Sequence, residues 1–429
     1  MQRLLATDPN FASQFRKVGN DRRESDADVA MQVTDILREV RNRGDAALSE
    51  FSMRFDGHAL TRDDDWTISA ERCREAYENL EPALRDALEL AAARIRAYHK
   101  DQIPADRDYV DGDGVRQGAI WRPVDAAGLY VPGGRAAYPS SLLMNAIPAK
   151  VAGVERLVVT TPTPKGESNP LVLAAAHIAG VDEMWRVGGA QAVAALAYGT
   201  QRIGKVDVIT GPGNAWVAEA KRQLYGVVGI DMVAGPSEIL VIADKDNDPD
   251  WIAADLLSQA EHDPSAQSIL ITDDKSFAAQ VEDCIDLQLA TLATGKTASA
   301  SWQEHGVVIV VETLDDAAAL ANELAAEHVE LAVANPEPLL KSIRHAGSIF
   351  MGRVTPEAIG DYVAGPNHVL PTGRRARFAS GLSVLDFMKR TSFISLGEDA
   401  LEKIGPAAVA LAHAEGLPAH AKSVELRLK

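Results

Sequence analysis

The sequence predicts an α/β protein whose parallel sheets are covered by helices on both faces. Two observations carry this prediction. Short apolar runs alternate with helical segments from about residue 117 onward, and strands that alternate with helices form right-handed βαβ units. The runs are also too numerous for one small sheet, so we expect two sheet domains.

Helices are expected to dominate the N-terminal quarter of the chain. Val33, Ile36, Leu37 and Val40 recur at the spacing that places them on one helical face. The segment LRDALELAAARIRAYH, residues 84–99, repeats this apolar spacing. Both segments therefore predict amphipathic helices.

The central part of the chain supplies the expected strands. Because both faces of a parallel sheet are covered, its strands read as continuous apolar runs. The runs that we expect to be strands are GAIWRPV, AAGLYV, RLVVTTP, MWRV, VDVITG, EILVIAD, SILITDD, GVVIVVE, VELAVAN and SIFMG. The helical segments between them include NPLVLAAAHIAG, GGAQAVAALAYG, GNAWVAEAKRQL and DDAAALANELAAEH.

The order of these segments predicts a discontinuous first sheet domain into which a second is inserted. We assign residues 25–129 and 239–381 to the first domain and residues 130–238 to the second. Residues 1–24 are expected to form an N-terminal helical arm. The residue pattern of 382–429 is typical of helices, which predicts a small tail domain.

The composition is that of a globular protein whose main partner is neither nucleic acid nor membrane. Hydrophobic residues make up 46% and charged residues 24% of the chain, and the formal net charge is −18. This acidic balance argues against nucleic acid and anionic membranes. No apolar stretch predicts a transmembrane helix or a secretory signal, so we expect a cytoplasmic protein. Cys73 and Cys284 are isolated, which excludes a disulfide framework and a cysteine-rich metal site.

Three strand-to-helix junctions are rich in glycine: YVPGG at 130–134, VGGAQ at 187–191 and GPGN at 211–214. Glycine lets the backbone approach a ligand closely, and a helix N-terminus offers free N–H groups to a phosphate. None of the three matches GxGxxG, so the dinucleotide-binding fingerprint is absent. The junctions alone leave nucleotide binding open, because many α/β proteins turn on glycines.

The helix that ends in LLSQAEHDP places Gln259 and His262 one turn apart on the same face. His is a common zinc ligand, whereas Gln is an unusual one. Two ligands do not make a site. The rest of the chain must therefore supply others, or the pair is structural.

Later segments offer further polar groups. Glu327 and His328 close an expected helix just before a strand, where position alone favours a His stabilised by the helix macrodipole. The irregular loop AIGDYVAGPNHVLPTG carries Asp361 and His368, and such loops commonly hold functional groups.

The C-terminal segment HAEGLPAHAKSVELRL adds Glu415 and His420 around a Gly-Pro break. Spacing does not identify which of these groups converge, since they are scattered along the chain. From the residues alone, the interpretation stops at a metal enzyme on an α/β scaffold.

A series of motifs takes the interpretation further. GGAQAVAALAYGT, GPGNAWVAEAKRQ, AGPSEILVIAD, LLSQAEHDP, EHVEL, GDYVAGPNHVLPT and GLPAHAKSVELR, in this order, resemble the motif series of the histidinol dehydrogenase family. The similarity extends from RGDAALSEF to VELRL, which is nearly the whole chain. Several long motifs in one order make this resemblance far more specific than any single dipeptide.

The resemblance implies two incomplete Rossmann-like domains, and it makes the missing GxGxxG a family trait. It implies a homodimer that depends on NAD and on one zinc ion per subunit. The implied reaction oxidises L-histidinol through L-histidinal to L-histidine with two NAD⁺, at the end of histidine biosynthesis. The implied role of the metal is to hold the substrate by its imidazole and amine.

Carried over by motif, the resemblance assigns ligands to both zinc and substrate. The zinc ligands would be Gln259, His262, Asp361 and His420. The same four residues would also bind the substrate, together with Ser237, His328, His368 and Glu415. In the family the C-terminal tail reaches into the partner subunit's site, so Glu415 and His420 would act in trans.

The resemblance also assigns the catalytic and cofactor-binding residues. His328 would be the general base of both oxidations, a role suited to a His near neutral pH. Glu327 would activate the water that hydrates the aldehyde. Tyr130, Gln191 and Asn214 would contact NAD, and all three fall in the glycine-rich junctions. Neither cysteine lies in a motif, so a thiohemiacetal route is not supported.

Three rival interpretations stay open. A related dehydrogenase could act on another alcohol, such as a small sulfonated diol, although His368 and Glu415 argue against it. A zinc hydrolase would need no nicotinamide. A non-enzymatic binding protein could keep the site as a structural metal clip, although structural zinc sites usually prefer Cys ligands. Mn²⁺ or Co²⁺ would accept ligands similar to those of zinc.

Overall fold

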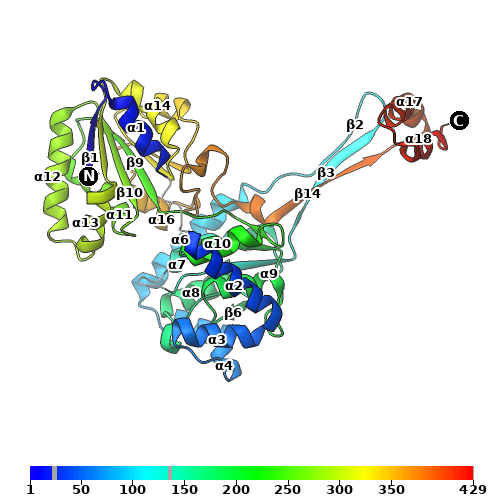
Figure 1. Ribbon diagram of the computed structural model, residues 1–429, viewed down its shortest axis with the longest axis horizontal. Coiled ribbons are helices and arrows are strands. Elements are labelled where there is room, and N and C mark those ends of the chain that lie inside the picture. Colours follow the sequence, from blue (N-terminus) through cyan, green and yellow to red (C-terminus); the bar gives the residue numbers. More distant parts are fainter. Residues whose placement is uncertain (22–26, 134–137, 429) are drawn as a thin grey trace.

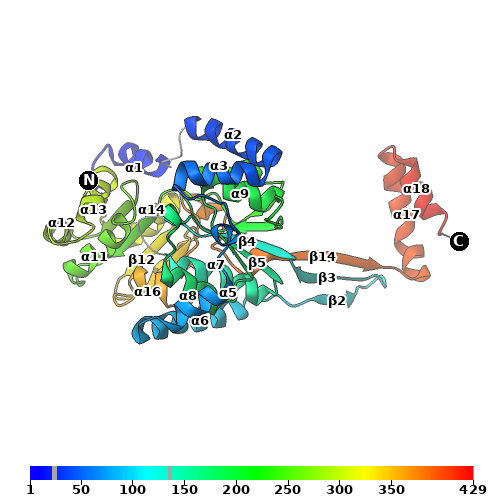
Figure 2. The same ribbon diagram turned by 90° about the horizontal axis from the view of Figure 1, so that it is seen from below.

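The computed structural model describes residues 1–21, 27–133 and 138–428. Two parallel sheets with helices on their faces form the body, and an antiparallel arm leads away from it to a helical tail (Figure 1). The view turned by 90° shows the same projecting arm (Figure 2). The predicted α/β class with two parallel sheets is confirmed.

The larger sheet has six parallel strands, in the order β1 (Gln2–Leu5), β11 (Val307–Val310), β10 (Gln267–Thr272), β9 (Glu238–Ala243), β12 (His328–Ala332) and β13 (Ser348–Met351). One face packs on α1 (Phe11–Asn20), α14 (Ala317–Leu324) and α15 (Glu337–Ser342). The other face packs on α11 (Pro249–Ala260), α12 (Lys275–Leu289) and α13 (Gly295–His305). Because both faces are covered, every residue of β9, β10 and β12 is buried.

The second sheet has five parallel strands, in the order β6 (Glu183–Trp185), β5 (Arg156–Thr160), β4 (Ala126–Tyr130), β7 (Val208–Thr210) and β8 (Gly229–Ile230). One face shares a core with α2 (Ala27–Arg43), α3 (Asp45–Asp56), α4 (Asp63–Trp66), α9 (Gly189–Tyr198) and α10 (Ala215–Leu224). The other face packs on α5 (Ala70–Glu78), α6 (Pro82–Lys100), α7 (Pro139–Ala152) and α8 (Pro170–Ala179).

The arm is an antiparallel ribbon of β2 (Arg107–Val110), β3 (Arg116–Pro123) and β14 (Met388–Ser395). β14 pairs with β3 along its whole length, and most of its residues are exposed. The tail helices α17 (Glu398–Ala414) and α18 (Pro418–Glu425) lie at the far end of this ribbon (Figure 1). The remaining described elements are α16 (Glu357–Tyr362), η1 (Pro164–Gly166), η2 (Leu314–Asp316), η3 (Arg375–Arg377) and η4 (Val384–Phe387).

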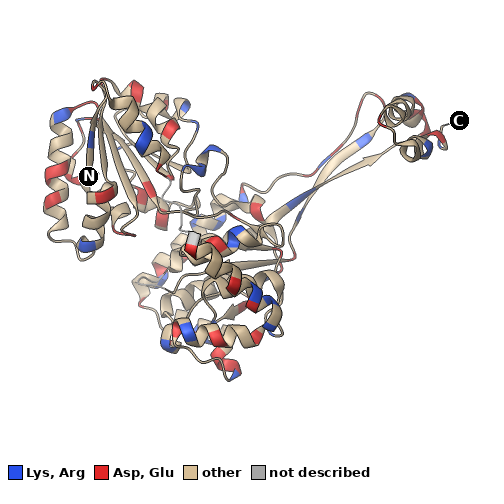
Figure 3. Ribbon diagram, in the orientation of Figure 1, with Lys and Arg blue, Asp and Glu red and all other residues tan. Residues whose placement is uncertain are grey.

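Charged side chains of both signs are interspersed on the helices around the two sheets, while the central strands are largely uncharged (Figure 3). The net negative charge is therefore not gathered on one element. Both cysteines are free. Within the described ranges, no helix combines the length and apolar character needed to cross a membrane.

The apolar runs expected to be strands all coincide with strands of the structure, which are β3 to β7 and β9 to β13. One of them differs in its setting. The run GAIWRPV forms β3, which belongs to the antiparallel arm and not to a parallel sheet. An apolar run predicts a strand, but it does not identify the partner with which that strand pairs.

Two helical predictions are wrong in part. Within residues 1–24, Gln2–Leu5 form β1, an edge strand that pairs with β11. Within residues 382–429, Met388–Ser395 form β14. A four-residue segment is too short to show any periodicity, and β14 owes its conformation to its pairing with β3.

The packing also differs from the expected division of the chain. The helices of residues 27–100 pack on the second sheet, although residues 25–129 were assigned to the first domain. Apolar spacing identifies the buried face of a helix, but not the sheet that covers it. The predicted boundary at residue 129 also divides β4 (Ala126–Tyr130), which is the central strand of the second sheet. We therefore propose that residues 27–100 and 126–129 belong with 130–238, and the remaining domain boundaries stay predictions.

Candidate active site

The first group of polar side chains lies at the amino edge of the larger sheet, where β9 and β12 begin. His328 is the first residue of β12 and lies in register with Ile239 of β9. The Oε2 atom of Glu327 accepts a hydrogen bond from the Glu238 N–H at 3.0 Å. Neighbouring parallel strands begin at the same edge of a sheet, so these residues meet although they are far apart in the sequence.

The prediction that Glu327 and His328 close a helix is wrong. α14 ends at Leu324, and Ala325 adopts the left-handed conformation with φ 45° before the chain enters β12. No Gly or Pro marks this stop, and Ala is a strong helix former, so the sequence pattern placed the end of the helix too late.

Two helices bring side chains to the same edge: α11, which crosses over from β9 to β10, and α16, which follows β13. A helix that connects parallel strands runs back across the sheet, so its last turn lies beside the start of the strands. α11 ends at this edge with Gln259 buried, and the exposed His262 follows it. α16 places Glu357 and Asp361 one turn apart on one face.

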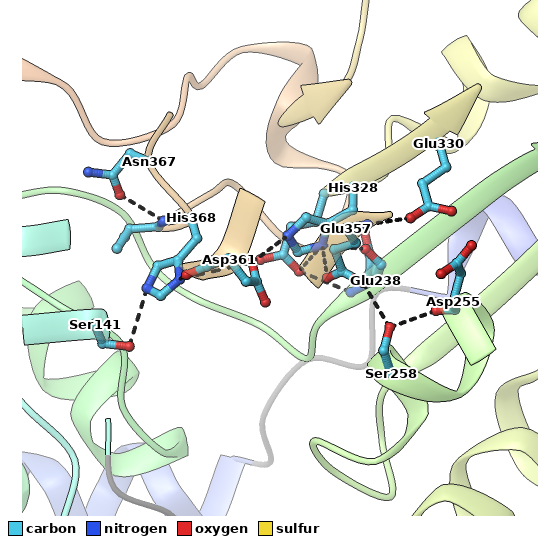
Figure 4. Close-up of polar contacts among 12 residues, drawn as sticks. Ser141, Glu238, Asp255, Ser258, His328, Glu330, Glu357, Asp361, Asn367 and His368 are labelled. Carbon is cyan, nitrogen blue, oxygen red and sulfur yellow. Dashed lines mark hydrogen bonds and ion pairs between the residues drawn. The ribbon is translucent and has the colours of Figure 1, made fainter. Parts of the chain in front are cut away.

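His328 is buried and is held in one tautomer. Its Nδ1 donates a hydrogen bond to the Glu238 carbonyl oxygen at 3.1 Å, and Glu357 Oε1 lies 3.2 Å from the same nitrogen (Figure 4). Because Nδ1 carries the proton, Nε2 is unprotonated in the neutral ring. Among the described residues Nε2 has no hydrogen-bond partner, and Asp361 Oδ1 lies 3.9 Å from it.

Burial lowers the pKa of His328 to about 4, and the nearby carboxylate of Asp361 opposes this shift only in part. The ring is therefore neutral at pH 7. A neutral, buried imidazole with an unpartnered Nε2 can accept a proton from a substrate.

Buried carboxyl groups surround the base. Burial, followed by the charge of Asp361, raises the pKa of Glu357 well above its usual range. Burial and then the charge of Asp255 do the same for Glu330, whose Oε1 accepts a hydrogen bond from the Glu357 N–H at 2.5 Å. Burial also raises the pKa of Asp255 to about 6. Buried carboxylates this close together repel one another, so the group must hold bound protons or a cation.

His368 approaches the same region from the loop after α16. Its Nδ1 bonds to the Asp361 carbonyl oxygen at 3.0 Å, and its Nε2 lies 3.3 Å from the hydroxyl of Ser141 on α7 (Figure 4). Asn367 holds this loop by donating to the Met144 carbonyl at 2.6 Å. Because α7 packs on the second sheet, the site lies between the two sheets.

Of the predicted substrate and metal ligands, Asp361 lies beside His328 and His368, and Gln259 and His262 lie on or just after α11. Ser237 directly precedes β9 and so lies at the same edge. Within the described part of the chain, one group of three residues could hold a metal ion, and it consists of His328, Glu357 and Asp361. It shares only Asp361 with the predicted ligand set.

Sequence reasoning missed Glu357 and Glu330. Glu357 lies four residues before Asp361, a helical spacing that could have identified it as a neighbour of the site. Glu330 lies two residues after His328, so it points to the same face of β12. Both signals are weak alone, because charged residues at these spacings are common on protein surfaces.

His420 and Glu415 do not join the other predicted ligands within one chain. Glu415 caps the C-terminus of α17 and His420 belongs to α18, and both are exposed. These helices lie at the end of the arm, away from β9, α11 and α16 (Figure 1). A single chain thus holds only part of the predicted ligand set.

The second group of predicted residues lies at the carboxyl edge of the second sheet. Tyr130 ends β4, and its hydroxyl accepts a hydrogen bond from the Gly189 N–H at 3.1 Å. Gln191 is buried on α9, and the exposed Asn214 caps α10 by accepting from the Val217 N–H.

The three glycine-rich junctions converge at this edge. A Cβ at Gly211 would lie 2.2 Å from the Tyr130 carbonyl oxygen, so the turn after β7 passes directly against the end of β4. Burial raises the pKa of Tyr130 to about 12, which keeps its hydroxyl protonated. Gly134, also part of a predicted junction, lies outside the described residues. Carboxyl ends of parallel strands are where open α/β sheets bind nucleotides.

Comparisons with known proteins agree with this geometry. The family model for histidinol dehydrogenase matches residues 20–428. A histidinol dehydrogenase of Zymomonas mobilis is 60% identical over 98% of this chain and 97% of its own length. One from Rhodospirillum rubrum is 60% identical over 99% and 98%. The crystal structure of histidinol dehydrogenase from Elizabethkingia anophelis superposes with a TM-score of 0.94 at 34% identity, covering 100% of this chain and 98% of that one.

The α/β fold, the buried histidine and the matching relatives define an NAD-dependent oxidoreductase. The match covers nearly the whole chain at high identity. The chain belongs to the histidinol dehydrogenase family.

Proposed function

We propose that this chain is a zinc-dependent histidinol dehydrogenase that oxidises L-histidinol through L-histidinal to L-histidine, the last steps of histidine biosynthesis, in the cytoplasm. The observation that carries the proposal is His328, a buried and neutral base. Its Nε2 has no hydrogen-bond partner among the described residues and lies beside Asp361. When bound, NAD⁺ supplies the hydride acceptor for both oxidations, and two NAD⁺ are reduced per substrate.

The first oxidation needs a base, because an alcohol releases hydride only as its O–H proton leaves. His328 accepts this proton at Nε2, while Nδ1 stays bonded to the Glu238 carbonyl. The carbon loses a hydride and becomes the aldehyde. The carboxylate of Asp361, 3.9 Å from Nε2, stabilises the charge of the resulting imidazolium.

The second oxidation starts with water. Glu327 takes a proton from the water as its oxygen bonds to the aldehyde carbon, and the imidazolium left by the first oxidation returns its proton to the aldehyde oxygen. This gives a gem-diol and leaves His328 neutral again. His328 then takes a proton from one gem-diol hydroxyl, the carbon loses its second hydride, and the carboxylic acid forms. The position of Glu327 supports this role, because the Glu238 N–H holds its carboxylate 3.8 Å from His328 Nδ1.

Gln259, His262 and Asp361 fit a zinc site of mixed nitrogen and oxygen ligands. The Oε1 atom of Gln259 is buried and has no hydrogen-bond partner among the described residues, which is unusual for a buried amide unless a ligand satisfies it. When bound, zinc supplies a Lewis acid that holds the imidazole and amine of the substrate. We assign zinc to this set and not to His328 with Glu357, because His328 must keep Nε2 available for protons.

A homodimer would complete the site. The tail at the end of the arm lies away from its own site, which supports insertion into a second subunit. His420 of the partner subunit would be the fourth zinc ligand, and Glu415 of the partner subunit would bind the substrate with Ser237 and His368.

The carboxyl edge of the second sheet is the proposed binding site for NAD⁺. Tyr130, Gln191 and Asn214 lie on its three converging junctions. Tight turns and free N–H groups at this edge are suited to the phosphates of a dinucleotide.

The test is the amount of NADH formed per L-histidinol consumed by metal-replete protein, before and after chelation. We expect two NADH, lost with the metal and restored by zinc. One NADH would instead indicate an alcohol dehydrogenase that releases its aldehyde. No NADH from metal-replete protein would contradict the proposed reaction and favour a hydrolase, a metal-bearing binding protein or a dehydrogenase of another alcohol.

A further inference from the structure

Among the described residues, Lys221 has one of the largest side chains that are fully buried. No step of the proposed mechanism uses it. It forms an ion pair with Asp231, and the two side chains are 2% and 1% exposed. Removing two charges from water is costly, and well-packed apolar residues often serve stability as well. A pair so fully buried therefore calls for a role beyond stability.

The pair holds both backbone groups of one residue. The Nζ atom of Lys221 donates to the Gly211 carbonyl oxygen at 3.0 Å. Asp231 Oδ2 accepts from the Gly211 N–H at 2.9 Å. Gly211 directly follows β7, has φ 112° and lies against the Tyr130 backbone. At the point where the chain leaves the sheet, these two side chains thus replace the hydrogen bonds of the ladder.

The same pair connects three elements around the turn of residues 211–214. Lys221 belongs to α10, whose N-terminus is capped by Asn214 at the end of this turn. Asp231 directly follows β8, and its Oδ1 accepts from the Met232 N–H at 2.6 Å. Displacing either side chain would shift the turn away from the backbone of Tyr130, against which Gly211 lies.

We propose that Lys221 and Asp231 are positioning residues for NAD⁺, because they fix the turn that presents Asn214 and the start of α10 to the dinucleotide. The inference rests on the proposed NAD⁺ site at the three glycine-rich junctions. Neither side chain touches the cofactor, since both are enclosed. They act through the backbone of Gly211.

The test uses direct NADH binding, followed by fluorescence, with the full-length zinc-loaded protein. The variants are Asp231→Asn, Lys221→Met and the double variant Lys221→Met/Asp231→Leu, which removes both charges but keeps apolar volume. The matched control is Lys150→Met, which breaks the more exposed Lys150–Asp182 pair beside the second sheet. Zinc content, the KM for L-histidinol and the thermal midpoint are measured in parallel.

We expect the dissociation constant for NADH to rise at least about tenfold in the folded variants, since small displacements of a binding group are costly. The KM for L-histidinol and the zinc content should stay at the parental values, and Lys150→Met should bind NADH like the parent. If a single variant does not fold, the double variant carries the test, because it leaves no unpaired buried charge.

NADH binding within twofold of the parent in the folded double variant would overturn the inference. So would an equal loss of affinity for NADH and L-histidinol, which would indicate a general structural role. If the parent binds NADH but makes none from L-histidinol, the proposed reaction fails. A selective loss of NADH binding in the variants would then still support the positioning role.

Discussion

The second sheet presents backbone turns at the carboxyl ends of its strands, whereas the larger sheet gathers side chains at the amino ends of β9 and β12. At the first edge, glycines allow close approach and helix N-termini offer N–H groups. At the second edge, His328 and several carboxyl groups come from the starts of β9 and β12 and from the helices α11 and α16. The comparison teaches that the same α/β architecture exposes backbone groups at one edge and encloses a neutral imidazole among carboxyl groups at the other.

The largest expected effect follows from replacing His328, the proposed base at the edge of the larger sheet. His328→Asn keeps an N–H donor for the Glu238 carbonyl but offers no basic nitrogen, so we expect kcat to fall about 10³-fold. Zinc content and NADH binding should be unchanged. His345→Asn, in a helix-end loop outside the site, is the control. A parental rate in His328→Asn would show that another group is the base.

Glu327→Gln should separate the two oxidations. The amide can still accept from the Glu238 N–H but cannot take a proton from water, so oxidation of L-histidinal should slow about 10²-fold. The yield should fall from two NADH per L-histidinol toward one. Glu312→Gln, an exposed carboxylate just after β11, serves as the control. An unchanged yield of two NADH would exclude Glu327 as the group that activates water.

Gln259→Ala tests whether the metal belongs to the amino edge of the larger sheet. We expect the affinity for zinc to fall by some tens of fold, because a buried ligand is lost, with the loss measured by competition with a chelator. Gln303→Ala, on the outer end of α13, should bind zinc like the parent. Parental zinc affinity in Gln259→Ala would favour the alternative group of His328, Glu357 and Asp361.

The smallest expected effect is on NADH binding at the edge of the second sheet. Asn214 and Asn169 both cap helices on this sheet, with side-chain acceptors for Val217 N–H and Leu171 N–H. Replacing either by Ala should cost about 1 kcal/mol of stability. Only Asn214→Ala should also weaken NADH binding, by about fivefold. Equal NADH binding in both variants would remove Asn214 from the cofactor site.

The sequence predicted the fold and the positions of the glycine-rich junctions better than it predicted the geometry around His328. Continuous apolar runs identify strands buried on both faces, and glycine marks the junctions that meet at Tyr130. Position alone argued against His328, because the usual rule directs attention to carboxyl edges. Only the motif series assigned it a role.

What could not be predicted depends on long-range packing. Glu357 and Glu330 have ordinary spacings in the sequence, and their raised pKa values come from burial and then from neighbouring carboxylates, both of which depend on the fold. β14 lies in a segment of helical texture, yet it forms a strand because β3 lies beside it. α14 ends before Ala325 without a glycine to mark its end, so the sequence pattern did not show that a strand begins at His328.

The arm of β2, β3 and β14 has a genetic consequence if the tail completes the site of another subunit. His328→Asn and His420→Ala would each be inactive alone. In a mixed dimer, one site would combine both lesions, while the other would receive an intact base from one chain and an intact tail from its partner. Random mixing of two dead proteins would then restore roughly a quarter of the parental activity. Two null alleles of one gene would complement each other.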